Sequence, residues 1–208
     1  MANITLKHNP STIGNHDTTT SGTYYLADNP LTYEIQRSNN FEFVVTGLNN
    51  LIRPGATGVE NNAYFDLDSQ KVIRLSVSKA PIPHFSQSVI TVRRGNNELK
   101  YAGVPTFGNG QISVVDYIGA DTKSVLMAWQ NLSYNVVTEK VGLVEDYKKD
   151  CYLMEYSPDQ QLVRKWRLYG CWISSISEGD YDAESNDKKM ISATIEYDKA
   201  KIDYDDLV

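Results

Sequence analysis

Hydrophobic and polar residues alternate along two successive segments within residues 165–199. One face of the first segment carries Trp166, Leu168, Gly170, Trp172 and Ile176. The other face carries Lys165, Arg167, Tyr169, Cys171 and Ile173. In the second segment, the apolar face holds Ile191, Ala193, Ile195 and Tyr197, and the polar face holds Ser192, Thr194 and Glu196. A period of two is the strand period, so the pattern predicts two β-strands joined by an acidic loop.

Six further segments have the composition or the alternation of strands, and they cover residues 41–47, 72–78, 88–94, 99–107, 111–118 and 149–156. The alternation is cleanest over 72–78, where Ile73, Leu75 and Val77 share one face and Arg74, Ser76 and Ser78 share the other. Pro81 and Pro83 follow this segment and cannot continue a ladder. Gly95 and the two asparagines after it are a turn signal between 88–94 and 99–107.

One helix is predicted over residues 121–133. Val125, Trp129 and Leu132 recur at spacings of four and three, and Asp121 is a suitable N-cap residue. A helix of this length does not persist alone in water, so we expect it to lay Trp129 against a sheet. The residues expected in the structural core are Trp129, Trp166, Leu168, Gly170, Trp172, Ile195 and Tyr197.

The remaining segments are polar. Residues 1–38 are predicted to form an extended N-terminal arm, and residues 49–70 a long loop insertion. The fold class predicted is mainly β: a single domain over 39–208, built as a β-barrel or sandwich with one packed α-helix.

The composition is that of a folded chain with an acidic surplus. Of 208 residues, 41% are hydrophobic and 22% are charged, which argues against overall disorder. The net charge is −6, whereas a protein that grips nucleic acid needs a basic surface. This balance suits a surface that DNA passes without sticking. No apolar run approaches the roughly 18 residues of a membrane span, and the N-terminus lacks the apolar core of a signal peptide.

The residues that most often carry chemistry form no recognisable site. His8 and His16 have no cysteine or carboxylate at ligand spacing, and no nucleophile elbow surrounds the serines near His84. Cys151 and Cys171 are expected to be small buried residues, with a disulfide between neighbouring strands as the alternative. No glycine-rich phosphate loop occurs. The sequence therefore predicts no catalytic residue, no cofactor and no metal.

Four acidic residues crowd the loop between the last two predicted strands: Asp180, Asp182, Glu184 and Asp187. A calcium loop places a central glycine among its ligands and closes with a glutamate at a fixed distance. Gly179 instead precedes the acids, and no closing glutamate follows at that distance. The pattern is typical of a solvated acidic loop.

An ordered set of features runs from residue 41 to about residue 203: a proline segment before a strand, a basic turn, a tryptophan-bearing helix, a Trp-x-Leu-x-Gly-x-Trp strand, a polar loop with a tyrosine, and a last strand ending in an aromatic and an acid. The residues are Pro81, Pro83, Arg93, Arg94, Trp129, Trp166, Leu168, Gly170, Trp172, Tyr181, Ile195, Tyr197 and Asp198. This order resembles the tail tube family of contractile phages, which is related to the tubes of contractile injection and type VI secretion systems.

The resemblance implies a structural virion protein without enzymatic activity. Its subunits would close into hexameric rings that stack into the inner tube of a contractile phage tail, assembled in the host cytoplasm. The implied partners are other copies of the chain, the tail sheath protein, the tape measure protein, and the baseplate and tail terminator proteins. DNA would pass through the lumen without specific binding, and no membrane would be involved.

Four polar regions are the candidates for contacts in such a tube. The faces Arg74/Ser76/Ser78 and Ser192/Thr194/Glu196 are expected to line the lumen or contact the next protomer, or else to face bulk solvent. The four acids of the 178–187 loop are expected to contact the next ring or the sheath. The 49–70 loop is a candidate bridge between stacked rings.

The arm and the 49–70 loop are larger than a minimal tube subunit needs, which keeps two alternatives open. One is a baseplate-proximal tube initiator or a terminator ring, or the tube protein of a related contractile injection system. The other is an unrelated β-sandwich binding module.

Overall fold

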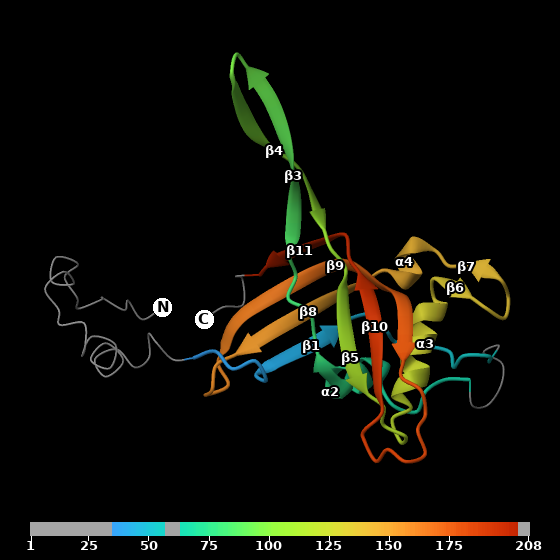
Figure 1. The fold of residues 1–208 in the computed structure, drawn as a ribbon. Coiled ribbons are helices and arrows are strands. Elements are labelled where there is room, and N and C mark those ends of the chain that lie inside the picture. The colour runs from blue at the N-terminus through green and yellow to red at the C-terminus, as the bar shows by residue number, and fades with distance from the viewer. Residues whose placement is uncertain (1–34, 57–62, 204–208) are drawn as a thin grey trace, which may run out of the picture.

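The computed structural model describes residues 35–56 and 63–203, and its centre is one curled antiparallel sheet of seven strands (Figure 1). The strands are β1 (Phe41–Val45), β2 (Val77–Lys79), β5 (Gly110–Val115), β8 (Lys149–Tyr156), β9 (Leu162–Glu178), β10 (Met190–Glu196) and β11 (Lys199–Ile202). They are ordered β1-β8-β9-β10-β5-β2, and β11 also pairs with β9. The fold is therefore mainly β, as predicted, and β1 and β2 are the two ends of the sheet.

Strand β9 holds the two halves of the sheet together. Its first part pairs with β8 and β11, and its last part pairs with β10. The register with β8 shifts by one residue between the pairs Cys151–Leu168 and Lys149–Cys171. Gly170 lies in this bulge with a φ of 66°, a conformation that glycine adopts without strain. A Cβ at this position would collide with the carboxylate of Asp198.

This bulge corrects the predicted faces of the strand. Leu168 points into the core, but after the bulge the buried positions are Cys171 and Ile173. Trp172 therefore leaves the core face and meets the ring of Tyr147, with ring centroids 6.0 Å apart. A one-residue bulge exchanges the two faces of a strand, which a strict period of two cannot anticipate.

The described residues contain three helices: α2 (Ser69–Ser76), α3 (Thr122–Asn131) and the single turn α4 (Val144–Tyr147). Helix α3 is the one predicted, and it packs on β9 and on α2. Trp129 lies in the core, only 1% exposed. The N-cap residue, Asp121, has a left-handed backbone conformation, and its side chain makes no capping hydrogen bond. The expected cap interaction is therefore wrong.

The predicted strand over 72–78 is also wrong, because most of it is helix α2. The Asp68 side chain caps this helix by accepting a hydrogen bond from the Gln70 main-chain N–H (3.0 Å). Val72, Ile73 and Ser76 are buried at helical spacing, and only the last residues of the segment enter β2. Ser76 and Ser78 alternate with apolar residues, so the segment resembled a strand with one polar face, although Ser76 lies on the buried face of α2.

The core fills the inside of the curl. The largest buried side chains come from α2, α3 and the inner faces of β1, β5, β8, β9 and β10. Leu168, Ile195 and Tyr197 are among them, Trp166 is half-buried against the cluster, and Gly170 stays at the bulge.

A second, separate pair of strands leaves the body. Strands β3 (Phe85–Arg94) and β4 (Asn97–Phe107) form a hairpin that projects from one end of the molecule (Figure 1). The predicted strands and turn of this segment are confirmed. A smaller hairpin joins β6 (Tyr134–Asn135) to β7 (Lys140–Val141). The predicted arm over 1–38 lies almost wholly outside the described residues, as do His8 and His16.

Candidate assembly surfaces

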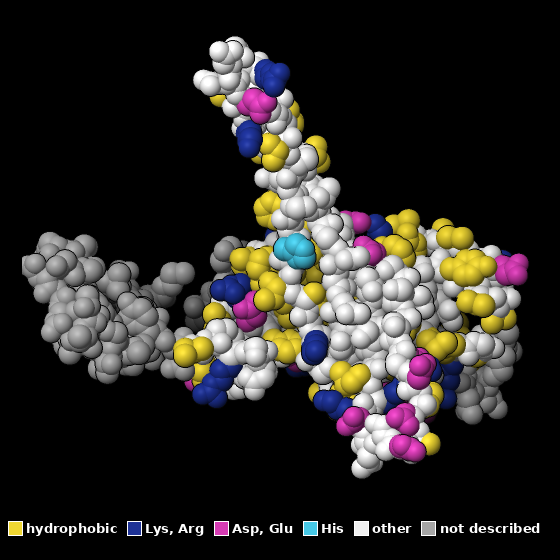
Figure 2. Space-filling model, viewed as in Figure 1, with side chains coloured by type: hydrophobic (Ala, Val, Ile, Leu, Met, Phe, Trp, Pro, Cys, Tyr) yellow, Lys and Arg dark blue, Asp and Glu magenta, His cyan; other side chains and the backbone are white. Residues whose placement is uncertain are grey.

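The β3–β4 hairpin is the most exposed part of the described chain. All residues of β3 and most residues of β4 are solvent-exposed. Figure 2 shows it standing clear of the body, with hydrophobic side chains along its length and basic ones near its tip. Three cations, Arg93, Arg94 and Lys100, and one carboxylate, Glu98, give the hairpin a net charge of +2.

One face of the hairpin is apolar. The register pairs Ile90 with Tyr101 and Val92 with Leu99, and paired residues lie on the same face of a ladder. We call these four residues the hairpin quartet. Their exposed fractions are 53%, 51%, 41% and 42% in the same order. The opposite face mixes apolar and polar residues, since it contains the pairs Val89–Ala102 and Thr91–Lys100.

The base of the hairpin is fixed to the sheet. The Phe85 and Phe107 rings lie 5.8 Å apart, and Phe107 meets the Tyr197 ring edge-on at 6.3 Å. The Tyr197 hydroxyl donates to the His84 carbonyl (3.4 Å), and burial raises the pKa of this tyrosine. The body therefore sets the direction in which the hairpin points.

An isolated two-stranded hairpin is at best marginally stable in water. Large apolar side chains in a row on an unpaired ladder also invite association with other chains. The quartet is an apolar face that no other part of the described chain covers. Its arrangement favours contact with another molecule.

The outward face of β5, β10 and β9 is polar and almost uncharged. Ser192 lies between Ser113 and Ser177, and Thr194 lies between Gln111 and Ser175. We call these six residues the neutral face. Glu196 stands at its end, where its Oε1 accepts hydrogen bonds from Asn109 and Ser174, both at 3.3 Å.

The other half of the sheet has a different outward face. The register aligns Arg167 with Tyr152 on one side and Lys201 on the other. The guanidinium stacks over Tyr169 with its carbon 4.7 Å from the ring centroid, and it bonds Asp150 at 2.8 Å. This hydrogen bond raises the pKa of Arg167. The outward face around Arg167 therefore carries cations and aromatic rings, whereas the neutral face carries mainly hydroxyl groups.

The predicted face Arg74/Ser76/Ser78 does not exist as one surface. Arg74 is exposed on α2 and pairs with Glu42. Ser76 is buried and bonds the Val72 carbonyl (2.7 Å), so it cannot line a lumen. Ser78 alone lies on the sheet, where its hydroxyl donates to the Ser113 carbonyl (3.1 Å). The cause is the same helix that replaced the predicted strand.

The acidic loop lies between β9 and β10, at the end of the molecule opposite the hairpin (Figure 1). Asp180, Asp182, Glu184 and Asp187 are all exposed. Glu178, the last residue of β9, is anchored instead, because it binds Lys123 of α3 at 2.8 Å and thereby raises the pKa of that lysine. Lys189 covers the Tyr181 ring at 3.9 Å. The loop is thus anchored to α3 at Glu178 and closed across itself by Lys189, and it presents its carboxylates to solvent.

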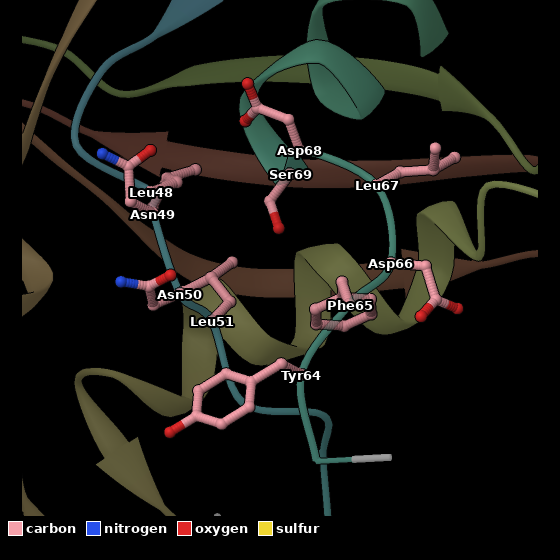
Figure 3. Close-up of a pocket in the computed structure, with 10 residues that line it drawn as sticks. All are labelled: Leu48, Asn49, Asn50, Leu51, Tyr64, Phe65, Asp66, Leu67, Asp68 and Ser69. Carbon is pink, nitrogen blue, oxygen red and sulfur yellow. The ribbon is translucent and has the colours of Figure 1, made fainter. Parts of the chain in front are cut away.

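The described parts of the 49–70 loop fold back on the body. Ile52 bridges Tyr64, and the Arg53 N–H donates to the Ala63 carbonyl at 2.7 Å. A shallow pocket of about 270 Å³ separates the two legs, with the Leu48–Leu51 side chains on one leg and those of Tyr64 to Ser69 on the other (Figure 3). Residues 57–62 lie outside the described chain.

The described residues offer little chemistry. Within 35–56 and 63–203, no group of three or more His, Cys, Asp or Glu side chains is arranged to hold a metal ion. The Ser86 hydroxyl pairs with Thr106 and the His84 ring lies near the Ile82 carbonyl. Cys151 and Cys171 are free and buried, and burial raises the pKa of the Cys151 thiol. No helix in this part of the chain is long and apolar enough to cross a membrane.

Comparison with known proteins identifies relatives of this fold. The family model described as "T4-like virus tail tube protein gp19" matches residues 61–201. A comparison with curated protein sequences finds no match.

Solved structures share the fold at low sequence identity. A chain of the extended-state sheath–tube complex of an extracellular contractile injection system called PVC is 17% identical, with a TM-score of 0.57 over 85% of this chain and 96% of that one. A chain of the PVC sheath/tube terminator is 19% identical, with a TM-score of 0.57 over 83% and 99%. A chain of the anti-feeding prophage cap is 16% identical, with a TM-score of 0.55 over 82% and 91%.

Proposed function

The chain belongs to the T4-like virus tail tube protein gp19 family, and from this premise we propose that it is the repeating subunit of a contractile phage tail tube. Its copies close into hexameric rings, and the rings stack into the conduit through which DNA leaves the virion. The family is one of structural tube proteins, and the proposed role is mechanical and not enzymatic.

The observation that carries the proposal is the exposed hairpin quartet. A projecting hairpin with one apolar face in water gives no advantage to a subunit that works alone. A subunit that repeats along a tube can place that face against its neighbours, where burial stabilises both partners by about 25 cal/mol per Å² of apolar surface.

The free edges of the sheet support ring closure. Strand β2 ends the sheet on one side, and the β8 pairing of β9 stops at Cys171. The part of β9 that pairs with β10 therefore has one edge without a strand partner in the described chain. Cyclic symmetry can join such edges between copies and remove them all at once.

The neutral face supports the assignment of the lumen. The six residues of the neutral face include no lysine or arginine, the side chains that hold DNA phosphates, and Lys79 of β2 pairs with Ser113 only at the edge of this face. A hydroxyl-lined wall lets DNA slide past without ionic contacts, so we place Ser192 and Thr194 on the lumen wall. The basic face on the other half of the sheet then points away from the DNA.

The remaining contacts follow from the tube itself. We place the tail sheath outside the tube, the tape measure protein inside it during assembly in the host cytoplasm, and baseplate and terminator proteins at its two ends. The acidic loop is proposed to contact the next ring, with the sheath as its other candidate partner. The 49–70 loop is a second candidate bridge between rings.

Shortening the hairpin tests the proposed function. The variant joins Gln87 to Pro105, which are paired in the register, through an Asn-Gly turn and so keeps the aromatic base. We expect a folded subunit whose unfolding midpoint is unchanged and which forms no tubes in electron micrographs. Tubes of normal length from this variant would contradict the proposal.

A second candidate is a ring at one end of the tube, or a tube of a related injection system. The similarity in fold to chains of a sheath/tube terminator and of a cap favours it, since both have TM-scores close to that of the chain from the sheath–tube complex. Electron microscopy of the purified protein separates the two: long tubes indicate the repeating subunit, and closed single rings indicate the end ring.

A further inference from the structure

The curled sheet does not close on itself. Within the described chain, β1 pairs only with β8 and β2 pairs only with β5, so a gap separates these two end strands. Helix α2 packs against β1 and β5 and fills part of the gap. The rest is an open groove of about 740 Å³, lined by residues of both end strands, and we call it the seam groove.

The seam groove is apolar inside and basic at its rim. Its apolar lining comes from the end strands and the segments next to them: Phe41, Val77, Ala80, Ile82 and Leu153. Ile82 is 66% exposed, and Figure 2 shows hydrophobic side chains gathered on the body at the base of the hairpin that follows it. Arg37 and Lys79 also line the groove, and neither takes part in an ion pair within residues 35–56 and 63–203. The groove therefore combines uncovered apolar surface with two unpaired cations.

We propose that residues 31–35 of the same subunit occupy the seam groove as an extended segment. The described chain begins at Ile35, and the residues that follow it, 36–40, form one wall of the groove. The inference goes beyond the proposed function and does not depend on it, because it concerns a single subunit.

The first argument is the pattern of the segment. Residues 31–35 alternate strictly, with Leu31, Tyr33 and Ile35 apolar and the two residues between them polar. This is the period of a strand with one buried face, and Pro30 marks its start because proline cannot continue a ladder. Ile35 is 77% exposed, so the described chain leaves it without a cover. An alternating segment and two unpaired sheet edges are the two halves of a strand addition.

The second argument is charge. Glu34 is the only charged residue of 31–35, and it lies on the polar face of the segment. With the apolar face in the groove, Glu34 faces the rim, where Arg37 and Lys79 have no other ion-pair partner in the described chain. An exposed ion pair contributes little to stability. It nevertheless favours this orientation, because the reverse one would bury a carboxylate among apolar side chains.

The third argument is the tether. Residue 35 is joined directly to the groove wall, so the segment is present at a high effective concentration. The same segment of another copy would first have to pay the entropy of association. The contact is therefore made within one subunit. It also divides the predicted arm, since residues 31–38 become part of the folded body and residues 1–30 start from a fixed point beside the groove.

Cross-linking of dissociated subunits tests the contact directly. The full chain carries Tyr33→Cys and Ile82→Cys, and its native cysteines are buried. After oxidation and denaturation, a gel without reductant should show a single-chain band that runs faster than the reduced chain, because the disulfide closes a loop. The control pairs Tyr33→Cys with Tyr181→Cys, an exposed position (79%) in the acidic loop, and should run with the reduced chain.

Three results of this experiment would overturn the inference. They are the absence of a disulfide, the same fast band in the control, and dimers in place of the fast single-chain band. The last result would mean that the groove receives the arm of another copy.

Unfolding of dissociated subunits tests it independently, and decides the case if the cysteine pair fails to fold. Leu31→Ser with Tyr33→Ser in the full chain should lower the equilibrium constant for folding at least about tenfold, because two large apolar side chains lose their burial. Tyr24→Ser with Leu26→Ser is the matched control at the same spacing, outside the segment, and should change that constant by less than about twofold. Equal effects of the two pairs, or no effect of the first, would overturn the inference.

Discussion

The curled sheet and the projecting hairpin are both built from strands with alternating apolar residues, but these residues are buried in the sheet and exposed in the hairpin. On β10 the apolar positions Ile191, Ala193 and Ile195 are at most 1% exposed, because α2 and α3 close the curl over them. On the hairpin the same alternation leaves the quartet about half in water. Alternation therefore indicates that a face will be buried, but it does not say which molecule buries it.

This comparison divides the chain into residues that stabilise the subunit and residues that stabilise the assembly. A truncation in the sheet should lower the free energy of unfolding of the isolated subunit. A truncation in the quartet should leave the free energy of unfolding of the subunit unchanged but prevent tube formation. The following variants test this division, beginning with the largest expected effect on subunit stability.

Trp129→Ala should lower the free energy of unfolding by about 3–5 kcal/mol, the usual cost of deleting a large buried side chain. Denaturant unfolding of dissociated subunits measures it. Trp129→Phe is the matched control: the indole N–H has no hydrogen-bond partner in the structure, so its loss breaks no bond and the cost should be clearly smaller. Equal costs for the two variants would show that the indole ring is not packed as described.

Gly170→Ala should cost about 1–3 kcal/mol, because alanine resists a positive φ and its Cβ meets the Asp198 carboxylate. That carboxylate also pairs with Lys148 at 2.7 Å, so the variant disturbs this contact as well. Gly179→Ala is the control, since nothing lies within 4 Å of a Cβ there. If the two glycine variants unfold at the same denaturant concentration, the bulge does not require glycine.

The bulge also shows where sequence reasoning succeeds and fails. Most of the long strands, the hairpin turn and helix α3 follow from local pattern, because each is encoded within a few neighbouring residues. The switch of face at Gly170 does not, since one glycine among alternating residues reads as a regular strand position. Because the bulge at Gly170 was not predicted, Trp172 was assigned to the wrong face of the strand.

The prediction of a strand in place of helix α2 was wrong for a different reason. Val72, Ile73 and Ser76 fit a helical period as well as alternate residues fit a strand, and seven residues are too few to decide. Asp68 as an N-cap was the missed signal. The isolation of the hairpin could not be predicted at all, because exposure of the quartet depends on what the rest of the chain leaves uncovered.

Substitution of one pair in the quartet gives the sharpest contrast with the sheet. Val92→Thr with Leu99→Thr places a β-branched residue at both positions of the ladder and should change subunit stability by less than about 0.5 kcal/mol. Tube formation should nevertheless be lost. Val89→Thr with Ala102→Thr is the control on the opposite face of the same hairpin, and it should assemble normally. A similar loss of tubes from both pairs would mean that the quartet has no special role.

Charges on the neutral face should have the smallest effect on the subunit. Ser175→Lys with Ser177→Lys, both exposed, should leave stability and tube length unchanged but make the lumen bind DNA in a salt-dependent way. Retention of DNA by purified tubes at low and high salt measures this. Ser175→Asn with Ser177→Asn should retain none. If the lysine variant retains no DNA, this face does not line the lumen.

The most direct test of the division is hydrogen exchange of the β3–β4 amides, measured on dissociated subunits and on assembled tubes of the native chain. The strands of the curled sheet should be protected in both states, because their faces are covered within one copy. The hairpin amides should exchange rapidly in the subunit and at least about tenfold more slowly in the tube, where another copy covers the quartet. Equally rapid exchange of the hairpin in both states would contradict the account.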